Sequence, residues 1–317
     1  MIRLVLYILL IMSLLTHCEG RKQQKQTKIA KDTINQVQPI SEMLCSLQDI
    51  RKEGCRSRAV FTDILMSIPG PTELSLFAKE QHVNNQLDFI SIAAKELQYQ
   101  PKEMYTQAWL LGAHFTRLTQ AWVYQKPTIA HIHLKAIKQL VTQLGITQHF
   151  NYSELNFLLT TPHKHEAFLM KTTQIYNNIL RGCFEFGRTD LSVSAIFMSL
   201  GSFTESLYFL IASAPSLDNE ALWERLADQK FMLEGYLLLL YFYDDLPNVM
   251  PVMMALDKLQ ALLEQVKKEY NRKDAQITVK GDVLVLNQQS TTKMTMSTKK
   301  KLPILIKQLR TQQLTRR

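Results

Sequence analysis

The sequence predicts an all-α protein, organised as an antiparallel multi-helix bundle with a small C-terminal β-hairpin and a final helix. Over most of residues 59–270, apolar residues recur every three or four positions, which is the period of an amphipathic helix. Hydrophobic residues make up 46% of the chain, and only 10 Gly and 10 Pro occur among its 317 residues, so we expect long regular elements around a packed core. The breaks between periodic segments are short, which favours consecutive helices packed side by side in opposite directions.

Each helix is expected to begin or end at a proline, a glycine or a polar capping residue, because these residues interrupt or cap the helical hydrogen-bond pattern. The first two helices flank Pro69-Gly70-Pro71, where the prolines prevent continuation. On these signals the predicted helices cover residues 59–68, 72–81, 84–98, 101–125, 127–144, 152–159, 165–186, 191–214, 219–243 and 249–270.

Near the C-terminus the period of the sequence changes from 3.6 to 2. Residues 276–279 and 283–286 flank Lys280-Gly281-Asp282, which predicts a β-hairpin that holds the only strands of the protein. Residues 297–314 then predict an amphipathic helix with one apolar and one basic face.

The first 17 residues are predicted to be a signal peptide for export. Arg3 precedes an uncharged apolar run from Leu4 to Leu15, and this run is shorter than the roughly 20 residues that a membrane-spanning helix needs. Cys18 follows, with Leu15 three positions before it, as in bacterial lipoproteins, whose cysteine becomes lipidated after cleavage. His17 is bulkier than the small residue usual at its position, and the alternative is an ordinary cleaved signal beside an incidental Cys18.

Residues 18–58 are predicted to be a lipid-anchored tether and a basic N-terminal segment. Their first part, residues 19–40, is rich in Gln, Lys and Thr and has few large apolar side chains, so it buries too little surface to fold. The helical bundle domain is then expected over residues 59–272, and the β-hairpin with the basic C-terminal helix over residues 273–317.

The net charge of +9 is concentrated at the ends of the chain. Residues 265–317 hold 13 basic and three acidic residues, whereas residues 59–264 hold 14 basic and 20 acidic ones. The centre is therefore acidic, and no basic motif interleaved with aromatic residues is visible, so nucleic-acid binding is not expected. Basic ends on an exported protein suit contact with anionic lipid or solubility.

The sequence contains no spacing typical of a metal, haem or nucleotide site, so we expect no metal, no cofactor and no catalytic residue. His131 and His133 are two residues apart, as are His163 and His165. On a helix such side chains point in different directions, so neither pair is expected to hold one ion. The alternative is an extended backbone at His163 and His165, which Pro162 allows and which would let that pair bind a metal.

Three cysteines remain besides Cys18. In an oxidising envelope Cys45 and Cys55 are close enough in the sequence to close a small disulfide loop. The alternative is three unpaired thiols, with Cys183 buried.

The best candidate site is Glu205, the one charged residue in the apolar run 191–214. This run is long enough to span a membrane, but its serines and threonines favour the central core helix of a bundle. A carboxylate there must be paired, be neutralised or face a cavity. We expect it to accept a hydrogen bond from a Tyr, Trp or Lys of an adjacent helix and to tolerate replacement by leucine. Gly201 and Ser202, one turn earlier, are expected to admit that helix closely.

Six stretches after residue 60 follow one another as Ser67–Leu74, Leu111-Gly112-Ala113, Leu140–Ile146, Ser199–Tyr208, Asp228-Gln229-Lys230 and the hairpin with its final helix. Their succession resembles a family of uncharacterised lipoproteins of Bacteroidetes. The resemblance implies a cell-envelope location and a helical fold, and it implies no activity. That family usually has an acidic residue where this chain has His114, so no role of that acid is carried over.

Two functions are compatible with these features. The first is a membrane-anchored cell-envelope lipoprotein that acts as a non-catalytic helical binding or scaffolding module, with membrane lipid attached through Cys18 and an envelope protein as partner. The alternative is a small-ligand binder or an enzyme that uses a cavity around Glu205. A closed, dry environment of Glu205 favours the first function, and a deep pocket with convergent polar groups favours the second.

Overall fold

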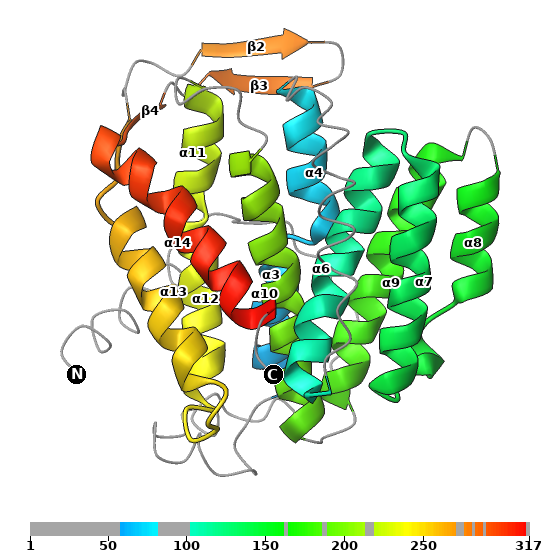
Figure 1. The fold of residues 1–317 in the computed structure, drawn as a ribbon. Helices are drawn as coiled ribbons and strands as arrows, with labels where there is room; N and C mark the ends of the chain where they lie inside the picture. The colour runs from blue at the N-terminus through cyan, green and yellow to red at the C-terminus, as the bar shows by residue number, and fades with distance from the viewer. Residues whose placement is uncertain are drawn as a thin grey trace, which may run out of the picture. The chain divides into compact units, whose positions relative to one another are not determined.

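The described part of the chain is mostly α-helical, which confirms the fold class at that level. The computed structural model describes residues 58–81, 102–161, 164–185, 189–212, 219–270, 276–280, 283–287 and 290–314 (Figure 1). All of them belong to one compact unit, Gln48–Arg317. The predicted signal peptide, Cys18, the tether, the Cys45–Cys55 loop and the predicted helix 84–98 lie outside the described residues.

The helices in chain order are α3 (Arg58–Ser67), α4 (Pro71–Glu80), α6 (Met104–Val123), α7 (Pro127–Gln143), the 3-10 helix η2 (Thr147–His149), α8 (Tyr152–Thr160), α9 (His165–Glu185), α10 (Thr189–Ala212), α11 (Glu220–Asp228), α12 (Lys230–Tyr241), α13 (Met250–Leu263) and α14 (Met296–Leu314). Several of their starts follow from local sequence. Pro71 and Pro127 open α4 and α7, where the missing N–H needs no partner. The side chains of Glu103, Asn151 and Asn219 accept backbone N–H groups at the starts of α6, α8 and α11.

The predicted helix 219–243 is wrong in one respect, because it consists of two helices, α11 and α12. The chain turns at Gln229, whose backbone N–H donates to the Leu226 carbonyl at 3.2 Å. The Gln229 side chain donates to the Arg225 carbonyl at 3.0 Å. No proline or glycine marks this break, so the apolar period passes through it.

The predicted helix 249–270 is also wrong, because α13 ends at Leu263 and Lys267–Tyr270 forms strand β1. β1 pairs antiparallel with β4 (Ser290–Lys293), so the expected hairpin does not hold the only strands. β2 (Gln276–Lys280) and β3 (Val283–Asn287) pair antiparallel with each other in a second ladder. β1 and β4 are short and polar, so no apolar alternation in the sequence marks them as strands. They form strands because they pair with each other across the intervening residues.

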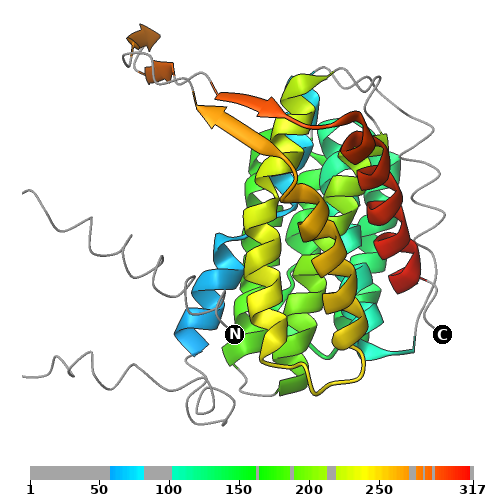
Figure 2. The ribbon, with the colours of Figure 1, turned by 90° about the vertical axis from the view of Figure 1, so that its left-hand side faces the viewer.

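α10 is the core helix of the described residues. It contacts α4, α6, α9, α12 and α14, and 19 of its 24 residues are buried. Figures 1 and 2 show α10 among these helices. α10 is also the one described helix that is long and apolar enough to cross a membrane, but 83% of its apolar window is buried within the protein. This burial agrees with the core helix that its serines and threonines predict.

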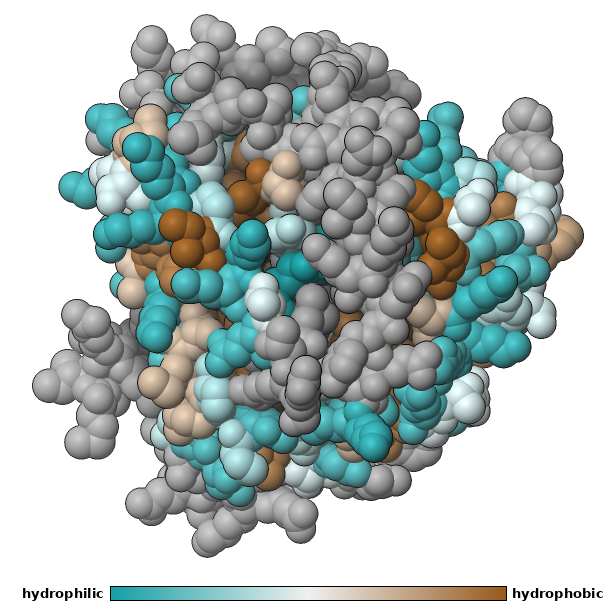
Figure 3. Space-filling model, in the orientation of Figure 1, coloured by the Kyte–Doolittle hydropathy of each residue, from teal (hydrophilic) through white to brown (hydrophobic). Residues whose placement is uncertain are grey.

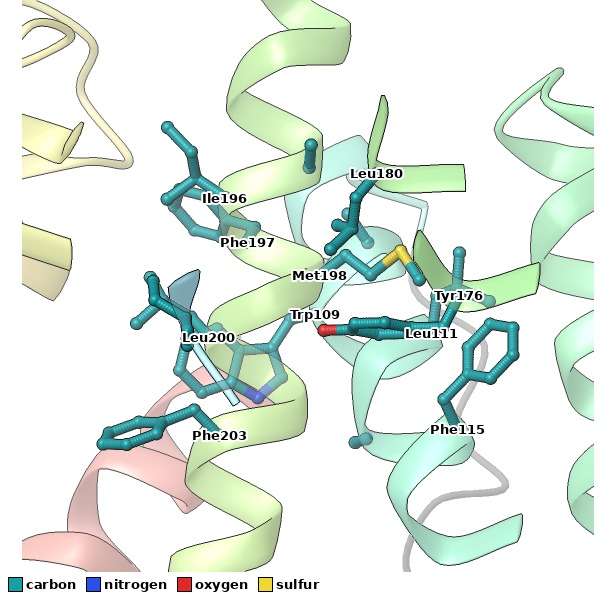
Figure 4. Packing of buried hydrophobic residues seen from close by; sticks show 14 of the residues in the cluster. Trp109, Leu111, Phe115, Tyr176, Leu180, Ile196, Phe197, Met198, Leu200 and Phe203 are labelled. Atoms are coloured by element: carbon teal, nitrogen blue, oxygen red, sulfur yellow. The ribbon is translucent and has the colours of Figure 1, made fainter. Parts of the chain in front are cut away.

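α6 and α10 approach each other backbone to backbone. A Cβ atom added at Gly201 would lie 2.0 Å from the carbonyl oxygen of Trp109, and one added at Gly112 would lie 1.7 Å from that of Met198. Neither position has room for a side chain, so the two glycines set the distance between the helices. The expectation that Gly201 admits a neighbouring helix is confirmed. Figure 4 shows Trp109, Met198 and Leu200 in the apolar packing of these helices.

We predict that Gly201→Ala lowers the free energy of unfolding by roughly 1–3 kcal/mol, because the added methyl group collides with a backbone carbonyl rather than with a movable side chain. Gly235→Ala is a matched helical control, since its Cβ atom would make an ordinary contact, 3.6 Å from Cγ2 of Ile64. Alanine there should stabilise the helix by roughly 0.5–1 kcal/mol. Urea unfolding compares the two variants, and equal stability would contradict the close approach of α6 and α10.

Candidate functional site

Glu205 lies inside the protein and forms ion pairs with two arginines from two other helices. Its residue surface is only 2% exposed. Arg117 of α6 donates from Nε to Oε1 at 2.5 Å and also pairs through Nη2. Arg310 of α14 donates from Nε to Oε2 at 2.7 Å and from Nη2 to Oε1 at 3.2 Å. We call these three residues the Glu205 cluster, and it ties α6, α10 and α14 together.

Both arginines of the Glu205 cluster are themselves buried, with 0% exposure for Arg117 and 5% for Arg310. Arg117 also donates from Nη1 to Oε1 of Gln120 at 3.0 Å. The guanidinium carbon of Arg310 lies 4.3 Å from the centre of the Tyr208 ring, and that of Arg117 lies 6.0 Å from it. Ring faces attract such cations, so the Tyr208 ring stabilises the two positive charges alongside the carboxylate.

The carboxylate of Glu205 is ionised at neutral pH. Burial raises the pKa of Glu205, but the charges and hydrogen bonds of Arg117 and Arg310 together outweigh burial and hold this pKa below its ordinary value. Burial also lowers the pKa of Arg117, and the charge of Glu205 opposes that shift. A guanidinium group stays protonated under these conditions, so the interior of the protein contains a true ion cluster.

The expectation that Glu205 is buried and satisfied by protein partners is confirmed. The type of partner is not the expected one, since arginines take the place of a Tyr, Trp or Lys. Ser202 hydrogen-bonds to Thr116 of α6, with 2.9 Å between the two hydroxyl oxygens, and so joins the same helix contact.

The sequence carries a signal for Arg117 as the partner of Glu205. Arg117 is the one Asp, Glu, Lys or Arg residue of α6, just as Glu205 is in the apolar run 191–214. Two apolar segments that carry single opposite charges predict an ion pair between them. Arg310 offers no such signal, because it is one of several basic residues in α14.

A buried histidine pair lies on the same face of α6, one turn before Arg117. Nδ1 of His114 and Nδ1 of His133, from α7, are 3.0 Å apart, and both residues are buried. One of these nitrogens must donate and the other must accept, so the accepting ring is unprotonated there. Burial, and to a lesser extent the charges of His114 and Arg117, hold the pKa of His133 well below its ordinary value. His133 is therefore neutral at physiological pH.

The described residues offer no group of three or more His, Cys, Asp or Glu side chains that could hold a metal ion. His131 is partly exposed whereas His133 is buried, so the two diverge as a helix requires. The ring of His165 stacks on Trp122, with ring centres 5.5 Å apart. His163 lies outside the described residues.

Three cavities in the described part of the chain lie away from Glu205. An open cleft of about 530 Å³ lies where η2 and the start of α8 meet α9, and its lining includes His149, Lys171 and Arg181. A groove of about 200 Å³ lies between α13 and α14. A space of only about 10 Å³ adjoins Cys183. Burial raises the pKa of the Cys183 thiol to about 12. That thiol is therefore protonated and a poor nucleophile.

The arrangement favours a structural role for the Glu205 cluster. Both carboxylate oxygens accept from guanidinium groups, and the side chains that surround them come from the protein itself. A general acid or base needs contact with substrate, and a ligand-binding carboxylate needs an open face. Glu205 is buried and lines none of the three cavities, so in the described part of the chain it has no open face.

We predict that Glu205→Leu lowers the free energy of unfolding by roughly 3–5 kcal/mol, because it leaves the guanidinium groups of Arg117 and Arg310 buried without their counter-charge. The two buried cations thus reverse the expectation that leucine is tolerated. Arg310→Leu should cost less, since Arg117 still neutralises the carboxylate. Chemical unfolding of both variants at pH 7 shows which one loses more stability. A fully stable Glu205→Leu variant would refute the role of this ion cluster.

The pH dependence of stability should report the buried histidine. The pKa of His133 is depressed in the folded state, so its contribution to stability is present above the ordinary pKa of 6.5 and is lost as the pH falls below that value. Below pH 6.5 the free energy of unfolding should fall by up to roughly 1.4 kcal/mol per pH unit, the value for the uptake of one proton. We predict that the free energy of unfolding of His133→Gln falls less between pH 6.5 and pH 5 than that of the parent protein. Urea unfolding at a series of pH values measures this difference. His131→Gln, at a partly exposed position, should change this pH dependence less than His133→Gln does. A larger effect of His131→Gln would show that His133 is not the residue responsible.

Comparison of the chain with protein-family models, curated proteins and solved structures finds no match in any of the three. The resemblance to lipoproteins of Bacteroidetes therefore stays a prediction, and function must be argued from the residues themselves.

Proposed function

We propose that this protein is an exported, membrane-anchored lipoprotein of the cell envelope that acts as a non-catalytic helical binding or scaffolding module. The observation that carries the proposal is the closed Glu205 cluster, in which a buried carboxylate is occupied by Arg117 and Arg310. Charged groups in the interior then stabilise one arrangement of helices, and the outer surface is left to contact partners. Membrane lipid attached at Cys18 and an envelope protein are the proposed partners, with no nucleic acid.

The proposed architecture is a single antiparallel bundle with a C-terminal hairpin. The contacts of α10 with five other helices support one shared core. The antiparallel pairing of β2 and β3 supports the hairpin. A rigid body of this kind suits a module that presents surfaces rather than one that closes around a substrate.

The competing proposal, a ligand binder or enzyme centred on Glu205, has less support. It requires a cavity of a few hundred Å³ at the carboxylate, on the order of a usual ligand site. The cleft of about 530 Å³ has the volume, but Glu205 is not among its lining residues.

We predict that the mature protein begins at Cys18 and carries lipid there. Intact-mass analysis of protein purified from the membrane fraction should show cleavage before Cys18 and the added mass of acyl chains. Cys18→Ala is the control and should lose both the lipid and the processing that depends on it. An unlipidated N-terminus beyond residue 18, or a retained apolar segment, would disprove the anchor.

A further inference from the structure

The outer faces of α13 and α14 combine exposed apolar side chains with lysines. Ile304 is 56% exposed and Met254 is 55% exposed. Lys300, Lys301 and Lys307 are exposed around Ile304, at positions that share its side of the helix. Figure 3 shows brown and tan side chains over these two helices, set among teal ones.

The charge of this surface has one sign along α14. That helix contains five basic residues and no acidic one. Its inner face carries Leu302, Ile306, Leu309 and Arg310, which are buried. Because Arg310 is held by Glu205 at 2.7 Å, the rotation of α14 about its axis is set, and the lysines must face outward.

The neighbouring helix extends the same surface. Met254 and Lys258 of α13 line a groove of about 200 Å³ together with Leu305 and Gln308 of α14. Met250, at the start of α13, is also exposed. Methionine side chains adapt to irregular apolar partners such as acyl chains. Lysine stems can lie along apolar material while their ammonium groups reach phosphate.

We infer that the outer face of α13 and α14, which we call the α13–α14 face, binds an anionic lipid surface. Ile304 and Met254 would enter the boundary between headgroups and acyl chains, and Lys258, Lys300, Lys301 and Lys307 would contact lipid phosphates. Charge complementarity favours this occupant, because a membrane surface is anionic over its whole extent and matches lysines that outnumber Asp257, the one acidic residue of these two helices.

A protein helix is a less suitable occupant. Such a helix needs a continuous apolar groove, with anchors spaced over two or more turns. The groove between α13 and α14 is small, and its lining includes Lys258, Gln308 and Gln312. Cys18 is not one of the residues that carry this inference, so the inference goes beyond the proposed lipid anchor and holds whether or not that cysteine is acylated.

Vesicle binding by the chain from Glu19 onward tests the inference, because this protein lacks both the apolar run Leu4–Leu15 and the cysteine at which lipid would be attached. Vesicles of phosphatidylcholine alone are compared with vesicles of equal parts phosphatidylglycerol and phosphatidylcholine. We expect tighter binding to the anionic vesicles, weakened by salt. The triple variant Lys300→Gln, Lys301→Gln, Lys307→Gln should bind them roughly a hundredfold more weakly, at about fivefold for each lysine.

A matched variant separates this surface from net charge alone. The triple variant Lys135→Gln, Lys138→Gln, Lys164→Gln removes three exposed lysines, two in α7 and one just before α9. It should leave vesicle binding nearly unchanged. Equal loss in both triple variants, or equal binding to neutral and anionic vesicles, would overturn the inference.

The apolar part has its own test. Ile304→Ser should weaken binding to anionic vesicles by roughly tenfold, because a largely exposed side chain contributes only when lipid buries it. Ile304→Trp should show a blue-shifted emission that brominated lipid quenches. If Ile304→Ser binds like the parent, the face is a general polyanion surface, and the lipid assignment is wrong.

Discussion

The ion cluster of Arg117, Glu205 and Arg310 is the interaction on which the arrangement of the helices depends. It joins α6 and α10, which form the centre of the described core, to α14, which comes last in the chain. A buried charge without its partner is far more costly than a buried apolar side chain, so arrangements that separate these three groups are strongly disfavoured. Apolar packing alone would tolerate several positions of α14, whereas Arg310 must reach one carboxylate.

The cluster forms only because α6 and α10 come very close. Gly112 and Gly201 let the two backbones touch, which brings Arg117 within hydrogen-bond distance of Glu205. The same face of α6 carries His114, which meets His133 of α7. Polar contacts therefore run through the interior from α7 to α14. We infer that these contacts set the register of the helices. The protein loses stability when the pH falls, because His133 becomes protonated in the unfolded chain.

A division between inside and outside connects these features to the proposed role. Inside, Glu205 pairs with Arg117 and Arg310, and His114 hydrogen-bonds to His133. Outside, α14 presents lysines around Ile304. Because Arg310 orients this helix, the interior ion cluster also decides which side chains the α13–α14 face offers. A helical module at a membrane needs such a rigid outer face more than it needs a reactive centre.

The sequence by itself determined the helical class, most helix boundaries and the burial of Glu205, because apolar period, prolines and capping residues act locally. It also contained a signal for Arg117, as a lone charge in an apolar helix. Only the tertiary structure decided that Arg310 completes the cluster, that His133 meets His114, that the chain turns at Gln229 and that β1 pairs with β4. These contacts join segments far apart in the chain or lack a local marker, and packing of the whole core selects them.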